Sequence, residues 1–209
     1  MTVKLSQKTK YRNDMFELIY PIEPAPMMPG LKAGGARELP AGEEVFPVVE
    51  TSGLVVGRAT RKYCHSGSRL LHPVVHLHII DRGERIYLQK RAMTKDIQPG
   101  KWDTAVGGHV SYGESLLEAL HRESMEELHL TRFNPVYIGT YPYESTRENE
   151  LVNIFAAVGS FEIRPDGEEV TEGKWWTLSE IDKAIGHNIL TPNFEMEFAK
   201  IRDKLIALL

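Results

Sequence analysis

The chain has 209 residues, of which 42% are hydrophobic and 26% charged, the balance of an ordinary globular protein that can bury a core. Its net charge of −4 argues against non-specific binding to a nucleic-acid polymer, because such binding needs a positive field. A single cysteine, Cys64, excludes an internal disulfide and a cysteine-cluster zinc site, and it favours a reducing compartment. The start lacks the apolar core of a signal peptide, and no segment approaches the ~18 apolar residues of a membrane helix. We therefore expect a cytoplasmic protein that does not enter a membrane.

The first part of the chain differs in composition from the rest. Segment 21–44 holds much of the proline and glycine, so residues 1–44 are predicted to form an extended N-terminal arm. Residues 45–209 are predicted to form a single domain.

Strand patterns occupy much of this domain. They cover 45–51, 53–59, 134–144 and 150–159, with two further strands within 72–91. Ser52-Gly53 is predicted to turn the first hairpin, and Asp81-Arg82-Gly83 the second.

A loop punctuated by proline and glycine, 96–115, precedes the first long helix, 116–128. The mainly apolar positions of that helix recur at steps of three and four residues. Segments 174–186 and 194–209 are also predicted to be helical. Mixed strands with few helices predict an α+β sandwich in which helices cover a central mixed sheet.

The helix at 116–128 carries the most informative pattern. Glu123, Glu126 and Glu127 stand at i, i+3 and i+4, so their carboxylates project from one face. Like charges so close cost helix stability, and a cation such as Mg²⁺ would offset that repulsion. A solvated acidic face is the alternative for glutamates taken alone. Glu114, near the helix start, is placed to meet Arg122 or the same metal.

The complete spacing resembles the Nudix box, the signature of a large family of diphosphate hydrolases. The matching positions are Gly108, Glu114, Arg122, Glu123, Glu126 and Glu127. The resemblance implies a helix–sheet–helix sandwich in which the box forms a loop, a helix and a second loop. Two residues depart from the family pattern. Ser124 replaces an aliphatic residue, and His129 replaces the glycine that commonly ends the helix.

This resemblance implies metal-assisted hydrolysis, in which Mg²⁺ or Mn²⁺ neutralises phosphate oxygens and activates water. Glu123, Glu126 and Glu127 are the expected metal ligands, and one of them or a glutamate elsewhere is the expected base. Arg122 is expected to orient Glu114 or Glu123 by a charge-assisted hydrogen bond. These five residues form the predicted catalytic set.

A second resemblance covers roughly residues 45–190 and is to the type 1 isopentenyl-diphosphate isomerases and their hydrolase relatives. It rests on the segments RKYCHSGSRLLH, LQKRAMTK, PGKWDTAVGGH and RENEL. In the isomerases the matching histidines and glutamates form one metal site, and three imidazoles with two carboxylates suit Zn²⁺ or Mn²⁺ chemically. The matching Arg91 and Lys95 imply a diphosphate site. The Arg guanidinium can donate two parallel hydrogen bonds to phosphate oxygens, and the Lys ammonium supplies a compact positive charge. The implied second metal site comprises His65, His72, His109, Glu148 and Glu150.

One departure bears on the reaction type. Where the isomerases carry a catalytic cysteine before Gly-His, this chain has Gly107, which cannot deliver or remove a proton. Cys64 is expected to be a small buried residue rather than a substitute acid. The isomerases have mostly lost the box carboxylates, whereas this chain retains them. Hydrolysis is therefore favoured over isomerisation.

Several other polar and aromatic residues could serve either the fold or the substrate site. His76 and His78 alternate along a strand and are expected to be structural. Glu168 and Glu169 are expected to solvate a loop, and the alternative is that they supply a distal base. Trp102, in the loop entering the box, is a candidate for the substrate cleft. The predicted substrate-binding residues are Arg91, Lys95, Trp102 and Gly108.

The leading hypothesis is a metal-dependent hydrolase that cleaves a diphosphate linkage in a nucleoside- or prenyl-type small molecule. The alternatives are isomerisation of an allylic diphosphate and a non-catalytic ligand-binding domain, although such domains usually lose the box glutamates. The predicted partner is a small diphosphate rather than a nucleic-acid polymer, and a homodimer is left open.

Overall fold

The structure is a computed structural model that describes residues 43–95 and 97–209. The predicted arm, residues 1–44, lies almost wholly outside the described residues, so its separation from the domain stays a prediction. Within the described residues, the first strand begins at Val45, the residue at which strand patterns start in the sequence.

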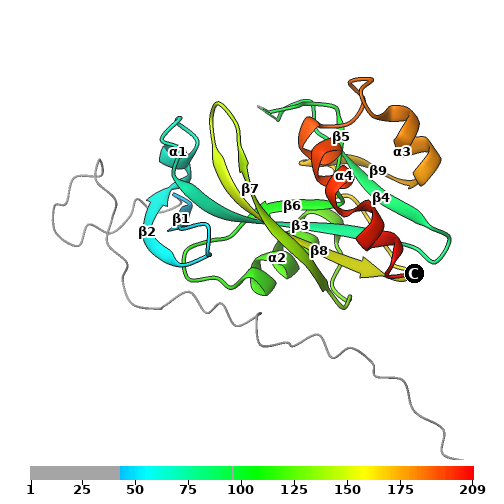
Figure 1. The fold of residues 1–209 in the computed structure, drawn as a ribbon, viewed down its shortest axis with the longest axis horizontal. Helices are drawn as coiled ribbons and strands as arrows, with labels where there is room; N and C mark the ends of the chain where they lie inside the picture. Colours follow the sequence, from blue (N-terminus) through cyan, green and yellow to red (C-terminus); the bar gives the residue numbers. More distant parts are fainter. Residues whose placement is uncertain (1–42, 96) are drawn as a thin grey trace, which may run out of the picture.

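The described strands form two sheets (Figure 1). Strands β1, Val45–Val49, and β2, Val55–Thr60, pair antiparallel as the predicted first hairpin. The larger sheet is mixed, because β3 and β8 are parallel while its other pairs are antiparallel. Its strands are β3 (Leu71–Ile80), β4 (Arg85–Arg91), β5 (Trp102–Asp103), β6 (Val106–His109), β7 (Val136–Glu144), β8 (Asn149–Val158) and β9 (Val170–Thr177).

Side chains alternate along β3 and enter two hydrophobic layers. Val75 and Leu77 pack with α2, Leu116–Leu128, whereas Val74 packs with α3, Leu178–Ala184, and α4, Pro192–Ile206. Figure 1 shows α2 separated from the α3–α4 pair by the strands of the sheet. The predicted α+β sandwich is confirmed. Within the described part of the chain, no helix combines the length and apolarity required to cross a membrane.

The two departures from the box pattern are accommodated locally on α2. Ser124 is fully buried, and its hydroxyl donates to the Leu120 carbonyl at 2.6 Å, so the polar atom has a partner. His129 caps the helix in the left-handed conformation, with φ 52°, and its N–H donates to the Met125 carbonyl. The helix therefore ends where the sequence predicts, without glycine.

Two other segments differ from the sequence-based prediction. Residues 174–186 were expected to form one helix, but β9 continues to Thr177, whose side chain then caps α3. Pairing of β9 with β4 overrides the local helical pattern there. The predicted loop at 96–115 contains β5 and β6, which are too short to show a strand pattern. Strand β6 matters most, because it places the start of the box on the sheet.

Candidate active site

The larger sheet has a gap beside β3, between strands β4 and β6. Strand β8 pairs with one edge of β3 over its whole length. On the other edge, β6 pairs with residues 74–77 and β4 with residues 79–80. Strands β4 and β6 therefore diverge from a shared neighbour, and a side chain from α2 enters the space between them.

That side chain is Glu127, of which 5% of the surface is exposed. Its Oε2 accepts hydrogen bonds from Nε2 of Gln89 on β4 and from the backbone N–H of Gly107 on β6, each at 3.3 Å. Burial raises the pKa of the Glu127 carboxyl well above its ordinary value, and the charge of Glu123 adds to this effect. A bound cation would restore the ionised form, so a carboxyl in this position suits a metal site. Gln89 lies in the segment LQKRAMTK but was not among the predicted site residues, and its contact with Glu127 appears only in the tertiary structure.

Arg122 connects the other box carboxylates. Its Nε and Nη2 donate to the two carboxylate oxygens of Glu114 at 2.8 and 2.9 Å. Nη1 donates to Glu123 at 2.7 Å and to Glu126 at 3.1 Å. These bonds, led by those to Glu114, raise the pKa of Arg122 and keep it charged. The structure thus brings Arg122 to both residues that the sequence expects it to orient.

Gly108 leaves room for Glu123 where β6 approaches α2. A Cβ atom at Gly108 would lie 2.0 Å from Cδ of Glu123, which is far inside contact distance. Burial raises the pKa of Glu123, against the lowering effect of Arg122. Arg122 holds Glu123 and Glu126, while Glu127 turns into the gap. Within the described residues, the three predicted metal ligands on α2 therefore do not converge on one point.

The predicted phosphate-binding cations are each paired with a carboxylate. Lys95 Nζ donates to Glu169 at 2.5 Å, and Arg91 Nη1 lies 3.4 Å from Asp103. Glu169 is an exposed loop residue, as the sequence predicts, but its charge helps to raise the pKa of the box carboxyls. The loop before β9 therefore lies beside the box, which local sequence does not reveal.

Trp102 lies on β5 and packs edge-on against Trp176, with ring centroids 5.3 Å apart. Its ring is only partly buried, and Lys90 Nζ lies 5.8 Å from its centroid. Trp102 therefore contributes to the hydrophobic layer under α3 and α4, and its contact with substrate stays a prediction.

Three histidines from separate elements meet near the end of β6. His65 follows α1, Arg61–Cys64, His72 lies on β3 and His109 ends β6. One ring nitrogen from each lies within 4.8 Å of the other two, and Nε2 of His65 is 3.1 Å from Nε2 of His109. Phe46 on β1 stacks on His109 with ring centroids 4.5 Å apart. The hairpin and α1 thus enclose the predicted histidine set.

Two carboxylates border this cluster. Glu148 lies 3.6 Å from Nε2 of His65, and Glu150 lies 3.8 Å from Nε2 of His109. Nδ1 of His72 donates to a backbone carbonyl at 2.9 Å, so its Nε2 carries a lone pair. This Nε2 is buried and has no hydrogen-bond partner among the described residues. A buried nitrogen without a partner, beside imidazoles and carboxylates, fits a metal ligand set.

Burial lowers the pKa of all three clustered imidazoles, in His65 to about 4, so they are in the neutral form that binds metal.

We expect the double variant His65→Ala, His72→Ala to lose the metal held at this cluster. Plasma mass spectrometry of protein loaded with Zn²⁺ or Mn²⁺ measures the content, and His187→Ala, which alters an exposed histidine, is the control. An unchanged metal content in the double variant would show that these histidines do not form a second metal site.

His76 and His78, expected to be structural, share one buried carboxylate. Glu197 on α4 is 1% exposed and accepts hydrogen bonds from His76 Nδ1 at 2.8 Å, His78 Nε2 at 2.6 Å and the Tyr141 hydroxyl at 2.8 Å. This network joins β3, β7 and α4. It therefore ties the helix layer to the sheet behind the gap.

The His76–Glu197 pair predicts a pH-dependent stability. Burial lowers the pKa of His76, but Glu197 outweighs this and raises it to about 9. Stabilisation by the pair is therefore complete below the unfolded pKa of ~6.5 and is lost as pH rises through about 9. We expect Tm to fall across this window by more in the wild type than in His76→Asn. Calorimetric unfolding on both sides of the window measures this, and parallel curves would contradict it.

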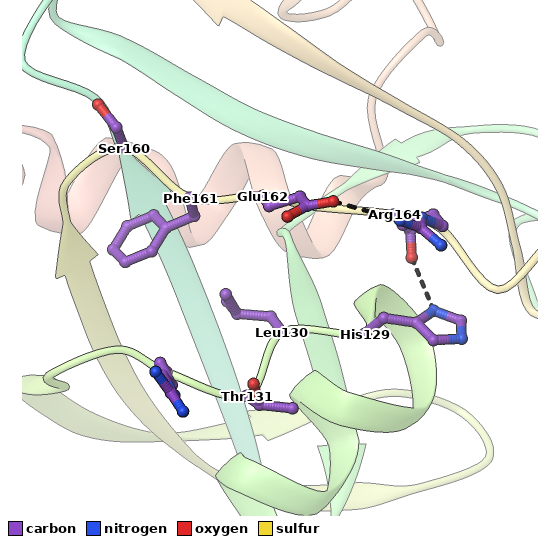
Figure 2. Close-up of a pocket in the computed structure, with 8 residues that line it drawn as sticks. His129, Leu130, Thr131, Ser160, Phe161, Glu162 and Arg164 are labelled. Atoms are coloured by element: carbon purple, nitrogen blue, oxygen red, sulfur yellow. Dashed lines mark hydrogen bonds and ion pairs between the residues drawn. The ribbon is translucent and has the colours of Figure 1, made fainter.

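A hollow of about 400 Å³ lies at the end of α2 (Figure 2). Its lining residues are His129, Leu130, Thr131, Arg132, Ser160, Phe161, Glu162 and Arg164. Figure 2 shows His129 directed at the Arg164 carbonyl, at 2.9 Å, and Arg164 paired with Glu162. None of the predicted site residues lines this hollow, so the gap beside β3 remains the candidate active site.

The fold and the box geometry together define a Nudix-type hydrolase domain. Residues 70–194, more than half of the chain, match the NUDIX domain family. The chain therefore belongs to the Nudix family, and the resemblance stated from the box is confirmed.

Relatives include proteins named as isomerases and as hydrolases. An isopentenyl-diphosphate Delta-isomerase of Clavibacter sepedonicus is 30% identical over 155 residues, which cover 71% of this chain and 82% of the relative. An uncharacterized Nudix hydrolase of Yersinia pestis is 29% identical over 170 residues, covering 76% and 92% respectively. The crystal structure of DR0079 from Deinococcus radiodurans gives a TM-score of 0.66 at 19% identity, covering 75% of this chain and 98% of that one. At 19% identity, the similarity to DR0079 shows a shared fold and nothing more.

Proposed function

We propose that this protein is a metal-dependent hydrolase that cleaves a diphosphate linkage in a nucleoside- or prenyl-type small molecule. The observation that carries this proposal is the placement of Glu127 in the gap between β4 and β6, beside carboxylates held by Arg122. A buried carboxylate near a second one, as Glu127 is to Glu123, is stabilised by a cation. The unpaired state of Cys64 supports a reducing, cytoplasmic location.

The chain's own groups have distinct roles in this proposal. Glu123, Glu126 and Glu127 would hold Mg²⁺ or Mn²⁺, and the chemistry supplied when that ion is bound is charge neutralisation and a more acidic water. Arg91 and Lys95 would bind phosphate oxygens, which replace their present carboxylate partners. Glu169, once released from Lys95, is an exposed carboxylate beside the box that can accept the proton of the attacking water.

The histidine cluster is proposed as a second, transition-metal site. His65, His72 and His109 supply neutral imidazoles, and Glu148 and Glu150 lie close enough to complete the ligand set. The cluster packs against Phe46, so a bound metal would also fasten the β1–β2 hairpin to the sheet.

Isomerisation is the competing activity, because several relatives are named isopentenyl-diphosphate isomerases. The resemblance to the isomerase family places Gly107 where that family carries its catalytic cysteine. Cys64 is fully buried with Phe46 and Ala59, and burial raises the pKa of its thiol to about 11. Neither residue supplies the acid that isomerisation needs.

A panel of nucleoside and prenyl diphosphates, incubated with Mg²⁺ or Mn²⁺, tests the proposal. Release of phosphate or a monophosphate with an unmoved double bond is the expected result. A shifted double bond would assign isomerisation instead, and tight binding without turnover would assign a ligand-sensing domain.

A further inference from the structure

His76 and His78 differ in what their second ring nitrogen meets, although both bind Glu197. The His78 side chain is 0% exposed, and its Nδ1 is enclosed without a hydrogen-bond partner among the described residues. The His76 side chain retains 10% exposure, and within the same residues its only hydrogen bond is the one from Nδ1. His76 therefore presents an accessible Nε2, whereas His78 does not.

The open edge of His76 lies against Gly107. The two residues are paired between β3 and β6, so they share a face of the sheet. A Cβ atom at Gly107 would lie 3.5 Å from Cδ2 and 3.7 Å from Nε2 of His76. The N–H of the same glycine donates to Glu127. One glycine thus lies next to the imidazole edge and also donates to a proposed metal ligand.

The hydrogen bonds around Glu197 place the compensating charge on His76. A buried carboxylate requires a cation, and of its three donors only the two imidazoles can carry one. Protonation of His78 would create an enclosed N–H without an acceptor, which is costly. Protonation of His76 places the second N–H at an accessible position instead. Of the other nearby acids, Asp103 already pairs with Arg91, and Glu150 lies 3.8 Å from Nε2 of His109.

We propose that His76 contacts the substrate directly, by donating its Nε2–H to an anionic oxygen of the diphosphate held beside Glu127. Glu197 and Tyr141 are positioning residues that fix the ring through Nδ1. The contact rests on the proposed function, and it adds a third cationic group to Arg91 and Lys95. It also gives Gly107 a role, since a side chain there would stand between the imidazole and the ligand.

The experiment measures binding of methylene diphosphonate, which cannot be hydrolysed, to the full chain with Mg²⁺ by calorimetry. His76→Asn keeps a donor for Glu197 at the Nδ1 position and removes the Nε2 group. His78→Gln keeps a donor to the same carboxylate at the Nε2 position and removes nothing accessible. We expect His76→Asn to weaken binding about tenfold or more, and His78→Gln to bind within about twofold of the wild type.

Nuclear magnetic resonance gives a second readout, which a purely structural histidine would not change. The ring Cε1–H signal of His76 should move when methylene diphosphonate is added, while that of His78 should not. Equal affinity of His76→Asn and wild type, equal losses in both variants, or no binding to the wild type would each overturn the contact.

The two proposals fail in different ways. Binding with a moving His76 signal but no turnover on any diphosphate would remove the hydrolase function and keep the contact. Turnover with an unchanged KM in His76→Asn would keep the function and remove the contact.

Discussion

Glu127→Gln is expected to lower kcat by about two orders of magnitude or more, because it removes a carboxylate charge from the proposed metal site. The amide fits the same space and can still accept from Gln89 and Gly107 through its oxygen. The fold should therefore persist. Initial rates on the best substrate of the diphosphate panel, with far-ultraviolet circular dichroism as a check on folding, measure the effect.

Glu118→Gln is the matched control for this variant. Glu118 lies on the same helix, but its exposed side chain belongs to the capping box with Ser115 rather than to the gap. We expect its rate to stay within about threefold of the wild type. Near-wild-type turnover in Glu127→Gln, with normal metal dependence, would remove α2 from the mechanism.

Gly108→Ala is expected to lower activity by about tenfold to a hundredfold, because the new methyl would occupy the position of the Glu123 side chain. Glu123 would have to leave Arg122 and the proposed metal site. Its carboxylate is the end of a flexible side chain, so the free energy of unfolding should change little. Electron paramagnetic resonance of bound Mn²⁺, together with kcat, separates a lost ligand from a lost fold.

Gly107→Ala offers the matched comparison on the neighbouring residue. Its methyl would meet His76 at 3.5 Å and Thr104 at 3.8 Å, both ordinary contacts. We therefore expect a smaller loss of Mn²⁺ affinity than in Gly108→Ala. A larger loss of Mn²⁺ affinity in Gly107→Ala would contradict the view that Gly108 is needed to leave space for Glu123.

Local pattern was sufficient where one element carries the whole signal. The helix at 116–128 contains its own cap, its apolar face and the box carboxylates, and the structure reproduces its limits. The histidine and glutamate set was found through a family resemblance, and the structure brings its imidazoles within 4.8 Å. Spacing alone could not have done this, because His65 and Glu150 come from elements far apart in the chain.

Local pattern failed where pairing between distant strands outweighs propensity. The local sequence of residues 174–177 predicts a helix, but these residues complete β9 because β4 offers a pairing edge. The same pairing brings Glu169 next to the box. Gln89 reaches Glu127 only because β4 leaves β3 after a short contact.

The sequence by itself determined the family and the helix that carries the box, since the box is encoded in spacing along one chain segment. Only the tertiary structure decided that Glu127 enters the gap beside β3, and that His76 is accessible while His78 is enclosed. The physical reason is that burial and hydrogen-bond partners depend on which elements pack together. Two histidines two residues apart on one strand therefore acquire different chemistry from the residues opposite them.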